Sequence, residues 1–488
     1  MDNTDVSTDV SENQIPDLMK IGEIPTSYGQ TLTTDVIDPA TFNQNRVRFT
    51  LSRVSGFLHS NSKITLAVTP LDTAAGANNA YYPFNIGVSS LIQSATLLVG
   101  NKQICAIEDY AQFHAYQSMF ISNENNKERE QYLSQRMMNH ESIYDARTGV
   151  VTDIPVNAGS TVGLDLGRNP IVAAGGAQAF TIFPFQQNDG ASAQTISEAP
   201  VYSVYLSDLF PFLKTNQLPA FMMDEEIHID ITFQDTVSSL AGSVQSTRMC
   251  VAVAGPQDAE FQIDESQVKL VYDSINYDGE IMRQYAEQNQ KLVFQYADYR
   301  LSKRTGDAAA FNSLTFPIGG NGRLVTKTIF GLQPASSVLA RSLVNNYGAA
   351  APPRETKVTT NLLYNDRYLF STDRSNNAQL FSTTSQAEQG VPMITRDEWQ
   401  NGGTVGAAQT AMTASTYEGH VQSSEVAGIQ GAFRWTSFRL NRGERINNKG
   451  IDLEYNAALG AGNFTLRAWV ELLKVATIEN GRTTCYFA

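Results

Sequence analysis

The sequence of 488 residues is poor in cysteine and in charged side chains, and it lacks any long apolar run. Its three cysteines lie far apart and form no CxxC pair, so we expect neither a disulfide framework nor a zinc knuckle, only reduced thiols. No stretch reaches 18 consecutive apolar residues, and the N-terminus lacks the features of a secretory signal. We therefore expect no membrane span and no standard export. The cysteines are Cys105, Cys250 and Cys485.

Basic side chains are scarcer than acidic ones, with 35 Lys and Arg against 49 Asp and Glu and a net charge of −14. No run of five basic residues occurs, which argues against an arm that coats nucleic acid and against a polybasic membrane patch. Residues 1–30 contain acidic side chains and a single base, Lys20. We predict that residues 1–30 form an acidic arm that is flexible or ordered only on a partner.

The sequence contains many segments with the residue pattern of β-strands. Residues 227–233 alternate isoleucine or phenylalanine with His228, Asp230 and Thr232, the signature of a strand with one buried face. Residues 95–107 predict a hairpin that turns at Gly100-Asn101. Further strands are predicted at 46–52, 64–68, 292–296, 311–318, 324–330, 433–435, 451–455 and 464–472.

Helices are expected to be few and short. The patterns predict helices at 108–120, at 123–138 and, as an exposed connection, at 278–288. Two long segments rich in Gly, Ala, Asn and Gln, at about 145–200 and 345–430, are predicted to be surface loop insertions.

Many short strands at this spacing predict an all-β fold of sandwiches or jelly rolls, and the length allows two such units. The predicted domains are the acidic arm at 1–30, a first jelly roll at 31–262, a linker with a short helix at 263–290, and a second jelly roll at 291–488.

Several motifs, in order along the chain, resemble the double jelly-roll major capsid proteins. Residues 97–104 with 108–120 are similar to that family's hairpin and helix, and 209–233 to the block that closes its first jelly roll. Residues 278–296 resemble its linker helix and next strand, and 464–486 its final strands. Asn101 departs from a usual second glycine, and Leu473-Lys474-Val475 from a usual Leu-Arg-Ile. The length and wording look more like virophages or Polinton-like viruses than giant viruses.

The resemblance implies two consecutive eight-stranded jelly rolls that stand perpendicular to a shell. It also implies a pseudo-hexagonal homotrimer, or capsomer, that tiles the icosahedral capsid of a double-stranded DNA virus. The expected partners are neighbouring capsomers, single jelly-roll penton proteins and minor capsid proteins, in a virion assembled in the host cytoplasm or nucleus. The loop insertions would be outward towers, and the acidic arm would lie at the inner base. A carbohydrate-binding or glycoside-cleaving jelly roll and a minor capsid or spike-bearing protein remain alternatives.

A metal site is the first chemistry to weigh. His228 and Asp230 lie two apart on one strand face, and Asp224-Glu225-Glu226 could add oxygen ligands. A zinc site needs three or four ligands, however, and the other histidines show no paired spacing. We expect a polar surface here and no metal.

The second kind of site to consider is a pair of catalytic carboxylates. Glu108-Asp109, Asp452 with Glu454, and Glu471 have the residue type for glycoside hydrolysis, but Asp452 and Glu454 simply occupy the polar positions of an alternating strand. Nucleophile-elbow and P-loop motifs are absent, and 319–322 precedes a strand, which indicates a turn. We predict no enzyme, no catalytic residue and no cofactor.

Nucleic-acid binding has one weak candidate, the basic residues Arg439, Arg442 and Arg445, which we predict to lie in a solvated loop without specific nucleic-acid binding. The sequon at Asn463 lies in a predicted strand, so we do not expect a glycan there.

Overall fold

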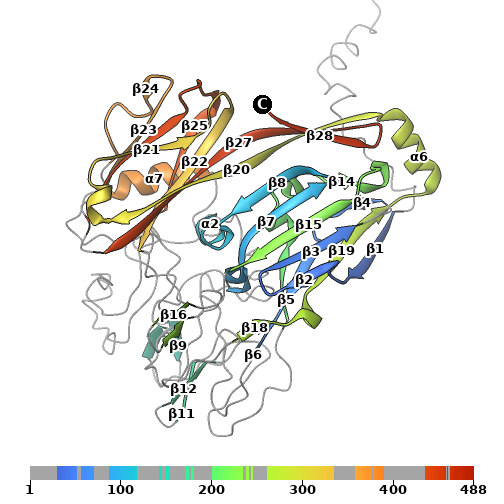
Figure 1. The fold of residues 1–488 in the computed structure, drawn as a ribbon, viewed down its shortest axis with the longest axis horizontal. Coiled ribbons are helices and arrows are strands. Elements are labelled where there is room, and N and C mark those ends of the chain that lie inside the picture. The colour runs from blue at the N-terminus through green and yellow to red at the C-terminus, as the bar shows by residue number, and fades with distance from the viewer. Residues whose placement is uncertain are drawn as a thin grey trace, which may run out of the picture.

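The computed structural model describes the strand-rich parts of the chain (Figure 1). The predicted helix at 123–138, Cys250, nearly all of the acidic arm and much of both loop insertions lie outside the described residues. The described ranges are 30–51, 56–70, 87–117, 142–145, 150–153, 171–174, 177–180, 201–234, 238–240, 243–245, 261–334, 358–374, 377–388, 435–457, 459 and 462–488.

The first half of the chain forms one β-sandwich, called here the first sandwich. Its strands are β1 (Thr31–Ile37), β2 (Thr41–Asn43), β3 (Arg46–Leu51), β4 (Phe57–Leu58), β5 (Lys63–Leu66), β7 (Ile92–Val99), β8 (Lys102–Glu108), β13 (Tyr202–Tyr205), β14 (Leu218–Pro219), β15 (Ile227–Phe233) and β19 (Lys269–Asn276). One sheet has the order β2-β3-β15-β7-β8. The other has the order β13-β5-β19-β4-β14, with β1 added on β19.

Strand β15 confirms the alternation predicted for 227–233. Ile227, Ile229, Ile231 and Phe233 are buried, while His228 is half-buried. The strand lies between β3 and β7, so its isoleucines fill the centre of the core. The hairpin at 95–107 is confirmed as β7 and β8, and Gly100 takes the positive φ of 56° that its turn requires.

The linker between the two halves is shorter than predicted. Strand β19 lies inside the segment 263–290, yet it pairs with β1, β4 and β5 and belongs to the first sandwich. Only α6 (Gly279–Gln288) connects the halves as predicted. Asp278 caps α6 by accepting a hydrogen bond from the N–H of Glu280 at 3.0 Å.

The second half forms the second sandwich. Its strands are β20 (Lys291–Asp307), β21 (Leu314–Gly319), β22 (Leu324–Pro334), β23 (Val358–Tyr364), β24 (Arg367–Tyr368), β25 (Thr436–Arg445), β26 (Ile451–Ala457), β27 (Asn463–Glu479) and β28 (Arg482–Phe487). One sheet has the order β20-β27-β22-β25, with β28 paired to β27, and the other has the order β21-β26-β23-β24. The fold is therefore all-β with two consecutive sandwiches, as predicted.

The insertion predicted at 345–430 is not loop throughout. It contains β23, β24 and α7 (Asn377–Glu388). Strand β23 escaped prediction because buried polar residues interrupt its pattern: Thr360 and Asn361 are almost fully buried, and Asn361 Nδ2 donates to the carbonyl of Phe370. Three short hairpins are also described: β9 (Ser142–Asp145) with β10 (Val150–Asp153), β11 (Ile171–Ala174) with β12 (Ala177–Phe180), and β16 (Ser238–Leu240) with β17 (Ser243–Gln245). Strand β6 (Val68–Pro70) pairs with β18 (Phe261–Ile263). The short helices are α2 (Tyr110–Gln117), α4 (Leu206–Leu209) and α5 (Pro211–Thr215).

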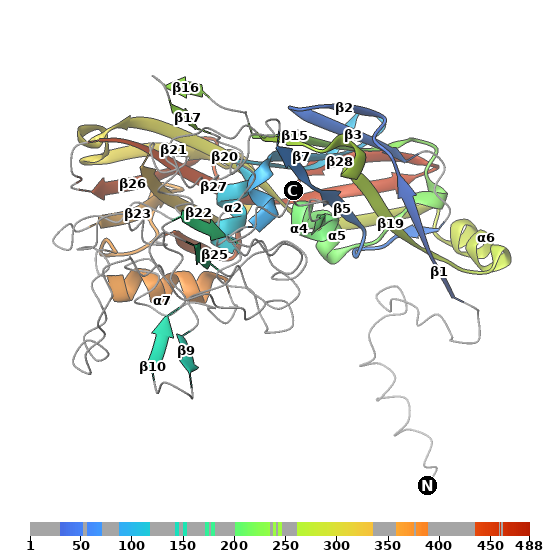
Figure 2. The ribbon, with the colours of Figure 1, turned by 90° about the horizontal axis from the view of Figure 1, so that it is seen from below.

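Strands β20 and β27 connect the sandwiches physically. They pair along their full 17-residue lengths, and with β28 they extend from the second sandwich across the first (Figures 1 and 2). Within the described ranges, none of the helices combines the length and the apolar character that crossing a bilayer needs.

Candidate functional site

The two sandwiches meet along a seam of buried polar side chains, which we call the inter-sandwich seam. Charged residues of β20, β22 and β27 face β8, α2 and α7 there. Such groups are costly to bury unless each has a partner, so their pairing decides whether the two halves hold together. The seam consists of three clusters centred on Lys474, Arg467 and Lys327.

The Lys474 cluster forms hydrogen bonds with the backbone of β8, an edge strand of the first sandwich. Lys474 Nζ donates to the carbonyl oxygens of Gln103 at 3.0 Å and Ile104 at 2.5 Å, both on β8. Tyr296 Oη donates to the same Ile104 carbonyl at 2.7 Å, and Asp298 accepts from the N–H of Ala106 at 3.4 Å. Strand β8 is the last strand of its sheet. Side chains of the second sandwich thus satisfy backbone groups that would otherwise form an open sheet edge.

In the Lys474 cluster, the lysine is paired with a buried carboxyl group, Asp298. Lys474 Nζ lies 3.3 Å from Asp298 Oδ2, and both side chains are almost completely buried. Burial raises the pKa of Asp298, although Lys474 and Arg300 act in the opposite direction. Burial likewise raises the pKa of Cys105 well above its ordinary value, so this thiol is protonated and unreactive at neutral pH.

The Arg467 cluster binds the turn between β8 and α2. Arg467 Nε donates to Asp109 Oδ2 at 2.6 Å, and its Nη1 donates to Gln333 at 2.9 Å. Asp109 has a positive φ of 49°, a conformation that a non-glycine residue keeps only when its surroundings hold it. Trp469 Nε1 donates to the carbonyl of Glu108 at 3.1 Å. Strand β27 therefore contacts this turn through two buried residues, Arg467 and Trp469, which lie two positions apart on one face of the strand.

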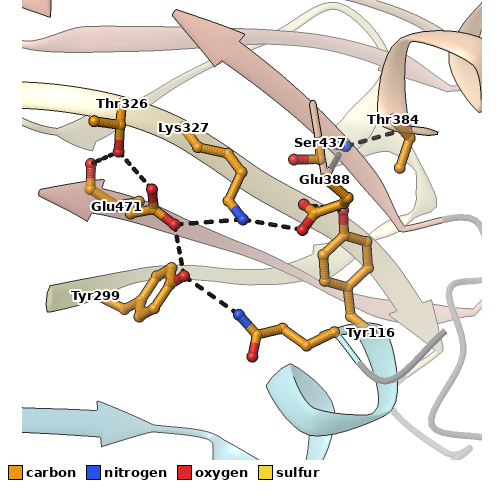
Figure 3. Close-up of polar contacts among 9 residues, drawn as sticks. Tyr116, Tyr299, Thr326, Lys327, Thr384, Glu388, Ser437 and Glu471 are labelled. Atoms are coloured by element: carbon orange, nitrogen blue, oxygen red, sulfur yellow. Dashed lines mark hydrogen bonds and ion pairs between the residues drawn. The ribbon is translucent and has the colours of Figure 1, made fainter. Parts of the chain in front are cut away.

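The Lys327 cluster lies between β22, β27 and α7 (Figure 3). Lys327 Nζ lies 3.0 Å from Glu388 Oε2 at the end of α7 and 3.3 Å from Glu471 Oε2 on β27. Glu471 also accepts hydrogen bonds from Tyr299 Oη and from Thr326 Oγ1, each at 2.6 Å. Glu388 accepts one at 2.8 Å from Tyr116 Oη of α2. One lysine thus joins β22, β27 and α7, and Tyr116 links this cluster to the first sandwich through Glu388.

The pKa values of the Lys327 cluster follow from burial and proximity. Burial lowers the pKa of Lys327, but Tyr299, Glu471 and Glu388 outweigh it and hold that pKa above its ordinary value. Burial raises the pKa of Glu471, but Lys327 and the two hydroxyl donors hold it below its usual range. The lysine and Glu471 are therefore both charged at neutral pH.

The residues weighed above as possible metal ligands pair with other side chains instead. Asp230 accepts from Arg48 Nε at 2.6 Å and from Arg46 Nη2 at 2.5 Å, and its pKa is lowered because these arginine contacts outweigh its burial. His228 Nδ1 lies 3.1 Å from Thr50 Oγ1. Glu225 pairs with Lys102 at 3.2 Å. In the ranges that the structure describes, no group of three or more His, Cys, Asp or Glu side chains could hold a metal ion.

The predicted carboxylate candidates separate in the structure. Asp109 and Glu471 belong to different clusters of the seam, where each is ion-paired. Glu454 accepts a hydrogen bond from Tyr368 at the surface of the second sandwich. The three arginines predicted to lie in a solvated loop all belong to strand β25, where Arg439 and Arg445 are exposed. Residues 319–322 form the expected turn, with positive φ at three glycines, and Asn463 begins strand β27.

Lys327, Lys474, Asp298 and Glu388 were missed as functional residues. Their available signal was a charge inside an otherwise apolar strand, clearest in β27, where Arg467, Glu471 and Lys474 interrupt buried residues. From sequence, Glu471 is only a carboxylate of the type that glycoside hydrolysis uses.

Comparison with known proteins gives relatives by structure only. No protein-family model and no curated protein matches the sequence. A chain of the Sputnik virophage, from its cryo-EM structure, has a TM-score of 0.53 and 13% identity, with 97% of this chain and 92% of that chain covered. The Faustovirus major capsid protein has a TM-score of 0.51 and 9% identity, with 96% and 93% covered. The PBCV-1 protein VP54, fitted into a Sputnik reconstruction, has a TM-score of 0.50 and 10% identity, with 94% and 97% covered. At this identity the shared property is the fold, and the double jelly roll implied by the sequence motifs is confirmed as the fold of this chain.

Proposed function

We propose that this double jelly-roll chain is the major capsid protein of a double-stranded DNA virus of eukaryotes, of the virophage or Polinton-like type. Three copies would form a pseudo-hexagonal capsomer, and capsomers would tile an icosahedral shell. The observation that carries the proposal is the pair of consecutive sandwiches joined by a buried seam, matched over more than nine-tenths of the chain by viral capsid structures.

The seam suits a building block. A shell subunit transmits force between its neighbours, and a chain whose two halves moved independently would present two unrelated surfaces to them. Breaking a buried ion pair leaves an uncompensated buried charge, so arrangements of the two halves that separate these partners are disfavoured. On this proposal the role of the seam is to hold the two jelly rolls of one chain in a single orientation, and the chain is a structural protein with no catalytic role.

Trimer formation tests the proposal directly. We expect the purified chain to have the mass of three copies by multi-angle light scattering and a hexagonal outline in negative-stain images, because a homotrimer of double jelly rolls presents six similar sandwiches around one axis. A monomer that binds oligosaccharides would instead support the jelly-roll carbohydrate protein, and a chain that binds only at the vertices of a shell built by another protein would support the minor capsid role.

The acidic arm gives a second prediction. Deleting residues 1–25 is expected to reduce shell assembly more strongly than trimer formation, because the proposal places this arm against a neighbouring capsomer or a minor capsid protein. Assembly is measured by sedimentation and trimer content by light scattering on the same preparation. Assembly at the wild-type level in the deletion variant would contradict this placement of the arm.

A further inference from the structure

Three cationic side chains surround one aromatic ring at the end of β28, and we call this group the Phe487 cluster. The guanidinium carbon of Arg323 lies 4.0 Å from the ring centroid of Phe487. Lys474 Nζ lies 5.2 Å from the same centroid, and the guanidinium carbon of Arg300 lies 5.3 Å from it. Strands β20, β27 and β28 supply Arg300, Lys474 and Phe487, and Arg323 comes directly before β22.

The charges of the Phe487 cluster do not balance. Asp298 is the carboxylate that pairs with it, at 3.3 Å from Lys474 Nζ and 3.6 Å from Arg300 Nη2. Arg323 has no ion pair with any residue that the structure describes. Three cations and one carboxylate leave two positive charges in excess, in a chain whose net charge is −14. A local excess of this sign favours an anionic ligand.

The two arginines keep hydrogen-bond donors that the fold does not use. Arg300 Nε is buried and donates to no acceptor in the described ranges, although the side chain as a whole is 39% exposed. Arg323 and Phe487 are half-buried. A contact with an aromatic face positions a guanidinium group without occupying its N–H groups. Those N–H groups form a planar fork that matches the oxygens of a carboxylate or phosphate.

Lys474 has a different place in the cluster. It is almost fully buried and already donates to the carbonyl oxygens of Gln103 and Ile104. It therefore adds positive charge beneath the ring, whereas Arg300 and Arg323 are the residues that a ligand from solvent can reach.

The position of the cluster favours phosphate as the anion. Figure 1 shows the end of β28, marked C, on the side of the molecule away from β9, β11 and β12. These three strands belong to the loop insertion that the proposed function places on the outside of the shell. On that proposal the Phe487 cluster faces the interior, where the packaged DNA presents its phosphates.

We propose that Arg300 and Arg323 form an oxyanion site for phosphate groups, in which Phe487 positions both guanidinium groups and Lys474 adds charge. The site itself stands on the contacts above, and its placement toward the packaged DNA rests on the proposed function. Free phosphate and the DNA backbone offer the same chemistry, so the experiments below distinguish these two sources. A phosphate contact reads no base sequence, in agreement with the expectation of no specific nucleic-acid binding.

Titration of the full chain with inorganic phosphate tests the site. Isothermal titration calorimetry at constant ionic strength is expected to show phosphate binding to the wild type and a loss of at least about tenfold in affinity for Arg323→Gln, because a charge-assisted hydrogen bond is removed. Phe487→Leu is expected to weaken binding as well, since it keeps every cation but releases the arginines from the ring. Arg482→Gln is the matched control, because Arg482 is exposed at the other end of β28. Unfolding midpoints in phosphate-free buffer verify that each variant is folded.

A short DNA duplex distinguishes the source of the phosphate. Fluorescence anisotropy over a series of salt concentrations gives the slope of log K against log salt. If the DNA backbone occupies the site, Arg323→Gln is expected to reduce this slope by about 1, and Arg482→Gln to leave it unchanged. An unchanged slope in Arg323→Gln, together with lost affinity for inorganic phosphate, would assign the site to free phosphate.

Two results would overturn the site. One is a wild-type chain that binds no inorganic phosphate, and the other is equal phosphate affinity in Arg323→Gln and Arg482→Gln. The mass of the chain by light scattering decides the capsid proposal separately. A monomer that binds phosphate through Arg323 would keep the site and contradict the capsid role, whereas a trimer without phosphate affinity would do the reverse.

Discussion

Replacing Lys327 by methionine is expected to lower the free energy of unfolding by about 3–5 kcal/mol, the usual cost of removing one partner from a buried ion pair. The side chains of Glu388 and Glu471 are only 8% and 17% exposed, and the lysine is the cation that lies within an ion-pair distance of both. Without it, two carboxylates are left buried and repelling each other. We expect the second sandwich to unfold at lower denaturant concentration and α7 to exchange its amide hydrogens faster.

A matched control is available at the surface. Lys449 pairs with Asp366, and both side chains are more than 70% exposed, so Lys449→Met makes the same chemical change where water solvates the remaining carboxylate. Its cost is expected to be at most about 1 kcal/mol. Both variants are compared with the wild type by denaturant unfolding at one protein concentration, because association would shift the midpoint. Equal costs for the two substitutions would show that the Lys327 cluster does not stabilise the fold.

The stability cost of Lys327→Met is expected to depend on pH, and the direction follows from the pKa of the buried Glu471 carboxyl group. In the wild type the pKa of Glu471 lies below its ordinary value, so its contribution is present at neutral pH and is lost as the pH falls through that lowered value. In the variant, burial without a cation raises the pKa of the Glu471 carboxyl group. The penalty then applies above the raised value and disappears as this carboxyl group takes up a proton. The stability difference between variant and wild type is therefore expected to shrink from pH 7 to pH 5.

Local pattern was enough to predict the elements of the fold that have one clean buried face. Strand β15 was predicted because apolar and polar residues alternate there without interruption, and the β7–β8 hairpin because Gly100-Asn101 separates two strand-like segments. Helix α6 was predicted as an exposed connection between the halves. Strand β23 was missed because Asn361 is buried and meets its hydrogen-bonding needs from Phe370 and Asp373, which no local pattern reveals.

The seam could not be predicted for a different reason. Its partners are distant in sequence: Arg467 contacts Asp109 across 358 positions, and Lys474 contacts Ile104 across 370. A charge in the middle of β27 shows that a partner is required, but a single sequence does not say which strand supplies it. Asp230 illustrates the same limit, since its arginine partners became evident only with the register of β3 against β15. The local sequence can predict that a segment forms a strand, but it does not show which strands lie beside it in the sheet.

An aromatic contact across the seam, between Trp469 and Phe113, gives the last prediction. Trp469 is fully buried, with its ring centroid 5.4 Å from Trp435 and 5.6 Å from Phe113 of α2, and its Nε1 donates to Glu108 at the turn before α2. Trp469→Ala is expected to lower the free energy of unfolding by about 3–5 kcal/mol, because it removes the ring and leaves a cavity.

A phenylalanine at the same position separates the ring from its hydrogen bond. Trp469→Phe keeps most of the aromatic contact but leaves the carbonyl of Glu108 without its donor, so a loss of about 1–3 kcal/mol is expected. Tyr486→Ala is the surface control, since Tyr486 is 55% exposed on β28, and its cost is expected to stay within about 1 kcal/mol. If Trp469 couples the sandwiches, Trp469→Ala should also separate the unfolding of the two halves into two transitions. Limited proteolysis measures this separation, and α6 is the expected cleavage site. A single transition, shifted no further than that of Tyr486→Ala, would mean that the polar clusters hold the two jelly rolls together without this tryptophan.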